Sequence, residues 1–139
     1  MVTATMKWQG GLKFEGTSVF GHTIITDAAL ASGGEESGYK PSELVLFGLA
    51  GCTGIDVVRI LEKQRQKVTA LEIEVIGHQP EQYPKPFDNV EVRYRFRGEG
   101  LDPQKVAHAI ELSESKYCLV SQTIQNPGKV TTSFEILPD

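Results

Sequence analysis

The chain has 139 residues, of which 40% are hydrophobic and 23% are charged, and its formal net charge is -4 at pH 7. This size and composition predict a single folded domain over residues 1–139 and disfavour disorder. The acidic balance argues against a nucleic-acid partner, because phosphate binding needs a concentrated basic surface.

The N-terminal residues are not expected to act as an export signal. Residues 1–7 lack the apolar core and cleavage site of a signal peptide, and we expect no apolar run long enough to cross a bilayer. Two cysteines in a domain that builds its own core do not make a disulfide framework. We therefore expect a cytoplasmic protein with no membrane partner and with both thiols reduced at rest.

The first forty residues are predicted to form short antiparallel strands. Residues 6–9 and 13–15 flank Gly10-Gly11, a two-residue hairpin signal, and residues 22–27 make a third strand. A glycine-rich and serine-rich stretch, residues 32–38, is expected to be a flexible loop.

A long helix is predicted over residues 41–65. Pro41 suits the first helical position, and its first half is apolar on nearly every side, as in a helix buried all round. Gly48, Gly51 and Gly54 each weaken the helix by about 1 kcal/mol relative to alanine. Their spacing of three residues therefore indicates that another backbone approaches this face closely.

The second half of the chain is predicted to form two strands, a helix and a last strand. The strands are residues 71–78 and 90–97, and Asp102-Pro103 opens the helix as N-cap and first turn. Residues 130–137 supply the last strand. The two-residue period of a strand places Arg93, Arg95 and Arg97 on one face, which we expect to be solvated or part of an interface. The helical period places four residues on one core-facing stripe: Val106, Ile110, Ser113 and Tyr117.

Covalent chemistry rests on two cysteines. Cys52 lies in the most apolar stretch of the chain, residues 44–61, and Cys118 lies where the second helix is expected to end. The three histidines show no metal-ligand spacing, and no phosphate loop or dinucleotide fingerprint is present. We therefore expect no metal and no cofactor.

On a helix, Cys52, Asp56 and Arg59 share one stripe. One interpretation is a thiol that cooperates with an acid and a base. The other is a buried cysteine that packs as a small hydrophobe above an Asp56–Arg59 ion pair. A carboxylate beside Cys52 disfavours its thiolate, so activation would need a cation from another element or subunit.

Two motifs resemble the OsmC/Ohr family of thiol peroxidases. Pro41-Ser42-Glu43-Leu44, followed by an apolar run into Gly51-Cys52, is similar to the central helix of that family. The run 98–106, followed by Ile110, Ser113 and Lys116-Tyr117-Cys118, is similar to its later helix. The order of elements matches over nearly the whole chain, and residues 52–58 resemble the YhfA-like branch of the family.

The resemblance implies an α+β protein of OsmC-like fold, with antiparallel sheets around two long central helices in an intertwined homodimer. It also implies that Cys52 reduces a hydroperoxide and becomes a sulfenic acid, with which Cys118 condenses to a disulfide. A dithiol reductant, dihydrolipoamide-like or thioredoxin-like, would then reopen the disulfide. An apolar pocket would favour organic over inorganic peroxides. The expected biological role is defence in a stress response.

The resemblance also indicates which residues support the first cysteine. The hydroperoxide branch uses a glutamate just after the proline, and that slot is Ser42 here, with Glu43 one position away. Its partner arginine comes from the N-terminal strands, where Lys13 is the nearest cation, since the first arginine of this chain is Arg59.

Two other functions remain open from the sequence. One is a non-catalytic dimer that binds a small apolar ligand, with both cysteines structural. The other is a hot-dog-like thioesterase, a long central helix wrapped by an antiparallel sheet, for which Glu43 is the one acid at the helix start.

Overall fold

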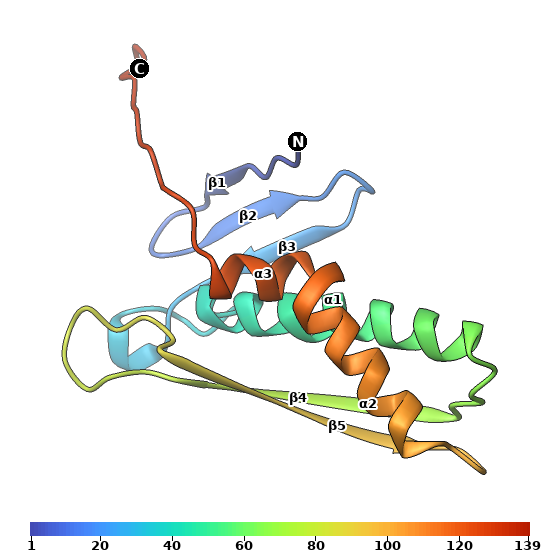
Figure 1. The fold of residues 1–139 in the computed structure, drawn as a ribbon. Helices are drawn as coiled ribbons and strands as arrows, with labels where there is room; N and C mark the ends of the chain where they lie inside the picture. The colour runs from blue at the N-terminus through green and yellow to red at the C-terminus, as the bar shows by residue number, and fades with distance from the viewer. The chain divides into compact units, whose positions relative to one another are not determined.

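The computed structural model describes residues 1–139, and these form two compact lobes. The sheet lobe comprises residues 1–48 and 75–92, and the helix lobe comprises residues 49–74 and 93–139. By residue number, one helix and two strands contribute to both lobes: α1 (Pro41–Lys63), β4 (Ala70–His78) and β5 (Asn89–Arg97). Figure 1 labels these elements.

Three short strands form an antiparallel sheet in the order β1 (Met6–Trp8), β2 (Phe14–Thr17) and β3 (Thr23–Thr26). Trp8 pairs with Phe14, so the β1–β2 connection is longer than two residues. Gly10 and Gly11 have φ angles of 92° and 55°, a conformation that favours glycine. The expected strands are therefore confirmed, and the hairpin turn is wider than expected.

The segment 32–38 is held in place, contrary to its expected flexibility. Asp27 is 4% exposed, and its carboxylate accepts hydrogen bonds from the backbone of Glu35 and from both the backbone and hydroxyl of Ser37. A Cβ at Gly34 would overlap the carbonyl of Ala28. Glycine is needed here for close packing, which composition alone does not distinguish from mobility.

Helix α1 begins at Pro41, as predicted, and ends at Lys63. Arg65 follows with a φ of 57°, and its N–H donates to Glu62 O while Gln66 N–H donates to Leu61 O. This is a Schellman motif whose left-handed position is occupied by arginine rather than glycine.

Strands β4 and β5 form a second, two-stranded sheet. Hydrogen bonds from Thr69 N–H to Arg97 O and from Asp88 N–H to His78 O close its two ends, so the strands are antiparallel. The core of the helix lobe consists of Val57, Leu61 and Ala109, packed against side chains from β4, β5 and α2 (Pro103–Leu112). Tyr94 and Phe96 are among them, as the alternation along the strand predicts.

The arginine row lies on the opposite face of β5. Arg95 forms ion pairs of 2.7 and 3.2 Å with Glu72 and Glu74, and Arg93 lies 3.8 Å from Glu74. This face is therefore solvated and largely charge-paired, which further disfavours phosphate binding.

The second predicted long helix is broken into three segments. After α2, residues Ser113–Tyr117 form a π-helical turn, and α3 (Leu119–Gln125) starts afresh after Cys118. The wide turn changes the helical phase, so Cys118 is fully buried while Tyr117 is 54% exposed. The prediction that Tyr117 lies in the core is wrong for this reason.

The predicted strand 130–137 is also wrong. The chain leaves α3 and forms no element after Gln125 (Figure 1). Val130, Phe134, Ile136 and Leu137 are between 71% and 91% exposed, because no strand of this chain pairs with the segment. Apolar, strand-like sequence without a partner is left at the surface.

Helix α1 also corrects the expectation about membrane spans. It is long and apolar enough to cross a bilayer by length and composition, with a mean hydropathy of 1.9 and 22% of that window buried within the chain. Leucine, valine, isoleucine and phenylalanine give the helix its high hydropathy, although glycines and polar residues interrupt the apolar sequence. Core helices of soluble proteins pass the same test.

Candidate active site

The two cysteines meet within the helix lobe. The Sγ atoms of Cys52 and Cys118 and a carboxylate oxygen of Asp56 all lie within 4.8 Å of one another. Cys52 and Asp56 are one turn apart on α1, and Cys118 lies between the π-helical turn and α3. Both cysteines are free thiols in this structure. We call Cys52, Asp56 and Cys118 the thiol cluster.

The two thiols differ in exposure and environment. Cys118 is completely buried, whereas Cys52 is half-buried. Burial above all, together with hydrogen bonding and charge from Cys52, raises the pKa of the Cys118 thiol to about 11, while the N–H groups of Ser121 and Val120 oppose the shift. Cys118 is therefore a protonated thiol at neutral pH. Its Sγ accepts the Ser121 N–H at 3.4 Å and so caps α3.

A chain of three hydrogen-bonded hydroxyl groups ends at the carboxylate of Asp56. Ser113 Oγ lies 2.9 Å from Asp56 Oδ2 and 2.9 Å from Thr53 Oγ1, and Thr53 Oγ1 lies 2.7 Å from the hydroxyl of Tyr94. Ser113 has one hydroxyl hydrogen, and a carboxylate can only accept. With Asp56 ionised, Ser113 donates to Asp56, Thr53 to Ser113 and Tyr94 to Thr53.

This hydroxyl chain is buried, and sequence patterns do not show that its members form one unit. Thr53 is 1% exposed and Ser113 is fully buried. Burial raises the pKa of Tyr94, although its hydrogen bond with Thr53 opposes the shift. The signal in the sequence was a polar Ser113 on an otherwise core-facing stripe, since buried polar groups need partners.

The expected Asp56–Arg59 ion pair does not form. Arg59 is exposed on α1, and the hydrogen-bond partner of Asp56 is Ser113. The stripe therefore divides: Cys52 and Asp56 face Cys118, while Arg59 faces solvent. The π-helical turn supplies Ser113 in place of the arginine.

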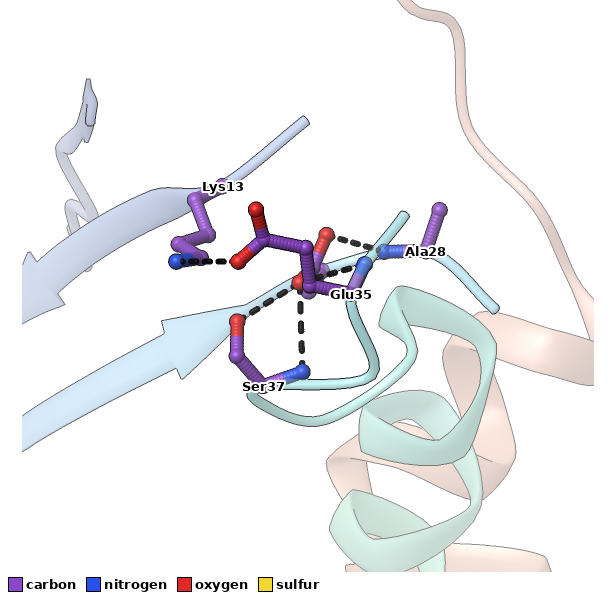
Figure 2. A network of polar contacts seen from close by, with 5 residues as sticks. Lys13, Ala28, Glu35 and Ser37 are labelled. Atoms are coloured by element: carbon purple, nitrogen blue, oxygen red, sulfur yellow. Dashed lines mark hydrogen bonds and ion pairs between the residues drawn. The ribbon is translucent and has the colours of Figure 1, made fainter. Parts of the chain in front are cut away.

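The other predicted supporting residues lie in the sheet lobe. Ser42 is exposed at the start of α1, and Glu43 Oε1 accepts the backbone N–H of Lys40 at 3.1 Å, which caps the helix. Lys13 Nζ lies 2.8 Å from Glu35 Oε2, and Figure 2 shows these two side chains pointing toward each other. The hydrogen bond with Glu35 and its charge raise the pKa of Lys13.

Asp27 organises the same corner of the sheet lobe. The Ser37 hydroxyl, together with the N–H groups of Ala28, Ser37 and Glu35, lowers the pKa of Asp27 to about 2 against an opposing effect of burial. Figure 2 shows these donors converging from the loop and the end of β3. Asp27 therefore holds the loop that precedes α1 in place.

An apolar hollow of about 540 Å³ lies elsewhere in the sheet lobe. Phe20, Ile24, Tyr39, Leu44 and Phe47 supply most of its apolar lining. Tyr39 and Phe47 meet edge to face, with ring centroids 5.8 Å apart.

The glycine row on α1 faces two different environments. A Cβ at Gly54 would lie 3.1 Å from Ile73 Cδ1, a side chain rather than a backbone, and a Cβ at Gly51 would meet nothing within 4 Å. The close backbone contact predicted for this face is therefore not made at either residue within the chain.

Comparison with known proteins gives one consistent result. A family model described as OsmC-like protein matches residues 33–133. Protein YhfA of Escherichia coli K12 is 35% identical over 96% of this chain and 97% of its own.

Solved structures agree in fold. A hypothetical protein from Aquifex aeolicus is 28% identical with a TM-score of 0.79, covering 91% of this chain and 89% of its own. The organic hydroperoxide resistance protein OhrB of Bacillus subtilis is 22% identical with a TM-score of 0.58, and the match covers 90% of this chain and 92% of OhrB. The chain therefore has the OsmC-like fold and belongs to the OsmC-like protein family.

Proposed function

We propose that this protein reduces organic hydroperoxides with its two cysteines and a dithiol reductant. The observation that carries the proposal is the approach of Cys52 Sγ and Cys118 Sγ to within 4.8 Å in a chain of the OsmC-like family. OhrB, which shares the fold, is named for organic hydroperoxide resistance. Two thiols that are free and adjacent are poised to form a disulfide after one of them is oxidised.

Exposure assigns the roles of the two cysteines. Cys52 is half-buried and open to a small molecule, so it is the residue that meets the peroxide. Cys118 is completely buried beside it, so it acts after Cys52 has been oxidised. Cys118 has extended backbone angles between two helical segments, where a small adjustment closes the gap between the sulfurs.

The reaction proceeds in three balanced steps. The Cys52 thiolate attacks the distal peroxide oxygen, the O–O bond breaks, and the alkoxide leaves as an alcohol after taking up a proton. Cys118 sulfur then attacks the sulfur of the Cys52 sulfenic acid, and the hydroxyl group leaves with the Cys118 proton as water. An external dithiol, dihydrolipoamide-like or thioredoxin-like, finally reduces the disulfide with two electrons and is itself oxidised.

Asp56 supports this sequence from within the cluster. Its carboxylate lies beside both sulfurs and is oriented by Ser113, so it is placed to accept a thiol proton as the peroxide is attacked, while its negative charge disfavours a Cys52 thiolate before the peroxide binds. Ser42, Glu43, Lys13 and Arg59 remain proposed supporting residues, of which Glu43 and Lys13 already hold structural partners.

The setting of the reaction is also a proposal. We propose one OsmC-like domain over residues 1–139 in a cytoplasmic homodimer that acts in oxidative-stress defence. The homodimer is supported by apolar surface that the chain itself leaves open, including Phe47 and Ile55 on α1, Leu119 on α3 and the C-terminal segment with Phe134. Such surface on a single chain is typical of a protein interface.

The test is peroxide consumption by purified variants. The wild-type protein is expected to remove cumene hydroperoxide in the presence of dihydrolipoamide, and Cys52→Ser is expected to abolish turnover because a hydroxyl is a far poorer nucleophile than a thiolate. Cys118→Ser should complete one reduction and then accumulate a sulfenic acid at Cys52, detectable by dimedone labelling. Label on Cys118 in the Cys52→Ser protein, or equal activity of both variants, would contradict the assignment.

The apolar hollow of the sheet lobe favours a second candidate function, a non-catalytic dimer that binds a small apolar ligand. Its size, about 540 Å³, and aromatic lining suit such a molecule. Binding of a fluorescent apolar probe that is weakened by Phe47→Ser, together with no peroxide consumption by the wild type, would support this function instead.

A further inference from the structure

Three potential metal ligands converge at the thiol cluster. The Sγ atoms of Cys52 and Cys118 and a carboxylate oxygen of Asp56 are mutually within 4.8 Å. Two cysteine sulfurs and one carboxylate form a donor set typical of Zn²⁺ and Cd²⁺, and binding of the ion releases the thiol protons to solvent. A search for ligand spacing along the sequence cannot find this set, because Cys118 joins the other two only through the π-helical turn.

The spacing fits one tetrahedral ion. With Zn–S bonds of about 2.3 Å, a tetrahedral ion holds two sulfurs about 3.8 Å apart. The observed limit of 4.8 Å therefore calls for side-chain shifts of about 1 Å or less. Rotation of the half-buried Cys52 side chain about χ1 provides adjustments of this size.

Neighbouring groups already orient two of the three ligands. Ser113 Oγ donates to Asp56 Oδ2 at 2.9 Å and so fixes the orientation of a carboxylate that has an oxygen near both sulfurs. The Ser121 N–H donates to Cys118 Sγ at 3.4 Å. Hydrogen bonds of this kind fix the direction of metal ligands and raise metal affinity.

The site also has an entrance and an open position. Cys52 and Asp56 are only partly buried, whereas Cys118 closes the inner end of the cluster. Three protein ligands leave the fourth tetrahedral position for water or a small molecule.

We propose that the reduced protein binds one divalent cation of the Zn²⁺ and Cd²⁺ class through Cys52, Asp56 and Cys118. A disulfide between the two cysteines removes both sulfur ligands, so oxidation releases the ion. The bound ion in turn keeps the sulfurs from reacting with each other. The inference needs only the reduced thiols and their geometry, so it stands whether or not the protein consumes peroxide.

The experiment uses Cd²⁺ as the probe on the full, reduced protein under anaerobic conditions. Binding is followed by the ultraviolet sulfur-to-cadmium charge-transfer band, and Zn²⁺ affinity is measured by competition with a chromophoric chelator. We expect one ion per chain and no charge-transfer band after a thiol oxidant has formed the disulfide. Absence of the band in the reduced wild type, or equal binding by the oxidised protein, would overturn the proposal.

Substitutions distinguish a site with three ligands from nonspecific binding of the ion to cysteine thiols. Asp56→Asn keeps an acceptor for Ser113 but removes a charged ligand, and it should weaken Zn²⁺ binding about 10-fold or more, while Cys52→Ser should weaken it about 100-fold or more. Glu62→Gln removes an exposed carboxylate from the same helix and is expected to change nothing. Circular dichroism confirms that each variant is folded. The assigned site would be refuted if Asp56→Asn bound Zn²⁺ with wild-type affinity. It would also be refuted if Glu62→Gln lost as much Zn²⁺ affinity as Asp56→Asn.

Discussion

The buried hydroxyl of Ser113 should be a major stabilising group, because it joins α1 to the π-helical turn. Substitution by alanine removes its hydrogen bonds with the half-buried Asp56 and the buried Thr53. A hydrogen bond to a charged group contributes about 1.5–3 kcal/mol and a neutral one about 0.5–1.5 kcal/mol. Thr53 retains Tyr94 as a partner, so we expect Ser113→Ala to lower the free energy of unfolding by about 2–4 kcal/mol.

Urea unfolding followed by circular dichroism measures this loss. With an m-value of about 2 kcal/mol/M, a loss of 3 kcal/mol lowers the midpoint by about 1.5 M. The matched control is Ser115→Ala in the same turn, where the exposed hydroxyl donates to Glu111 O and a loss of no more than about 0.5 kcal/mol is expected. All variants must be compared at one protein concentration, since an oligomer adds stability by mass action.

A double-mutant cycle with Thr53→Val tests whether the two hydroxyls act together. Residues in one hydrogen-bond network show coupling of about 0.5–3 kcal/mol. If Ser113→Ala and Ser115→Ala have equal effects, or if the cycle shows no coupling, the buried hydroxyl chain does not stabilise the site as argued.

Three further predictions concern other parts of the chain. Arg65→Gly should raise the free energy of unfolding by about 0.5–1 kcal/mol in urea, because the left-handed position suits glycine; a destabilised variant would contradict the motif. Since the pKa of Asp27 is lowered from 3.8 to about 2, its contribution to stability is complete above pH 4 and is lost as the pH falls toward 2. Thermal unfolding of Asp27→Asn should therefore vary less than wild type between pH 4 and 2, and identical profiles would refute this. Sedimentation should show a homodimer that Phe134→Glu weakens, whereas a wild-type monomer at micromolar concentration would exclude the interface.

Much of the fold was predictable because local signals agree with the final structure. Pro41 opens α1, and the Asp102 carboxylate caps α2 by accepting the Gln104 N–H at 2.9 Å. The alternation along β5 correctly placed Tyr94 toward the core and Arg95 toward solvent. Each of these features depends on residues a few positions apart, which is the range over which sequence patterns are informative.

The features that escaped prediction depend on contacts between distant residues. The π-helical turn is not marked by any glycine or proline, yet it decides that Cys118 is buried and Tyr117 is exposed. The hydroxyl chain links positions 41 and 60 residues apart, from Thr53 to Tyr94 and to Ser113. The strand pattern of residues 130–137 was visible, but pairing requires a neighbour that this chain does not provide.

The most direct test of the proposed chemistry is a single exposure of the reduced protein to one equivalent of cumene hydroperoxide, without reductant, followed by peptide mapping by mass spectrometry. We expect one disulfide that links the peptides containing Cys52 and Cys118 within one chain, formed in proportion to the peroxide consumed. If both cysteines remain available to an alkylating reagent while the peroxide persists, the thiol pair is not a peroxide-reducing site.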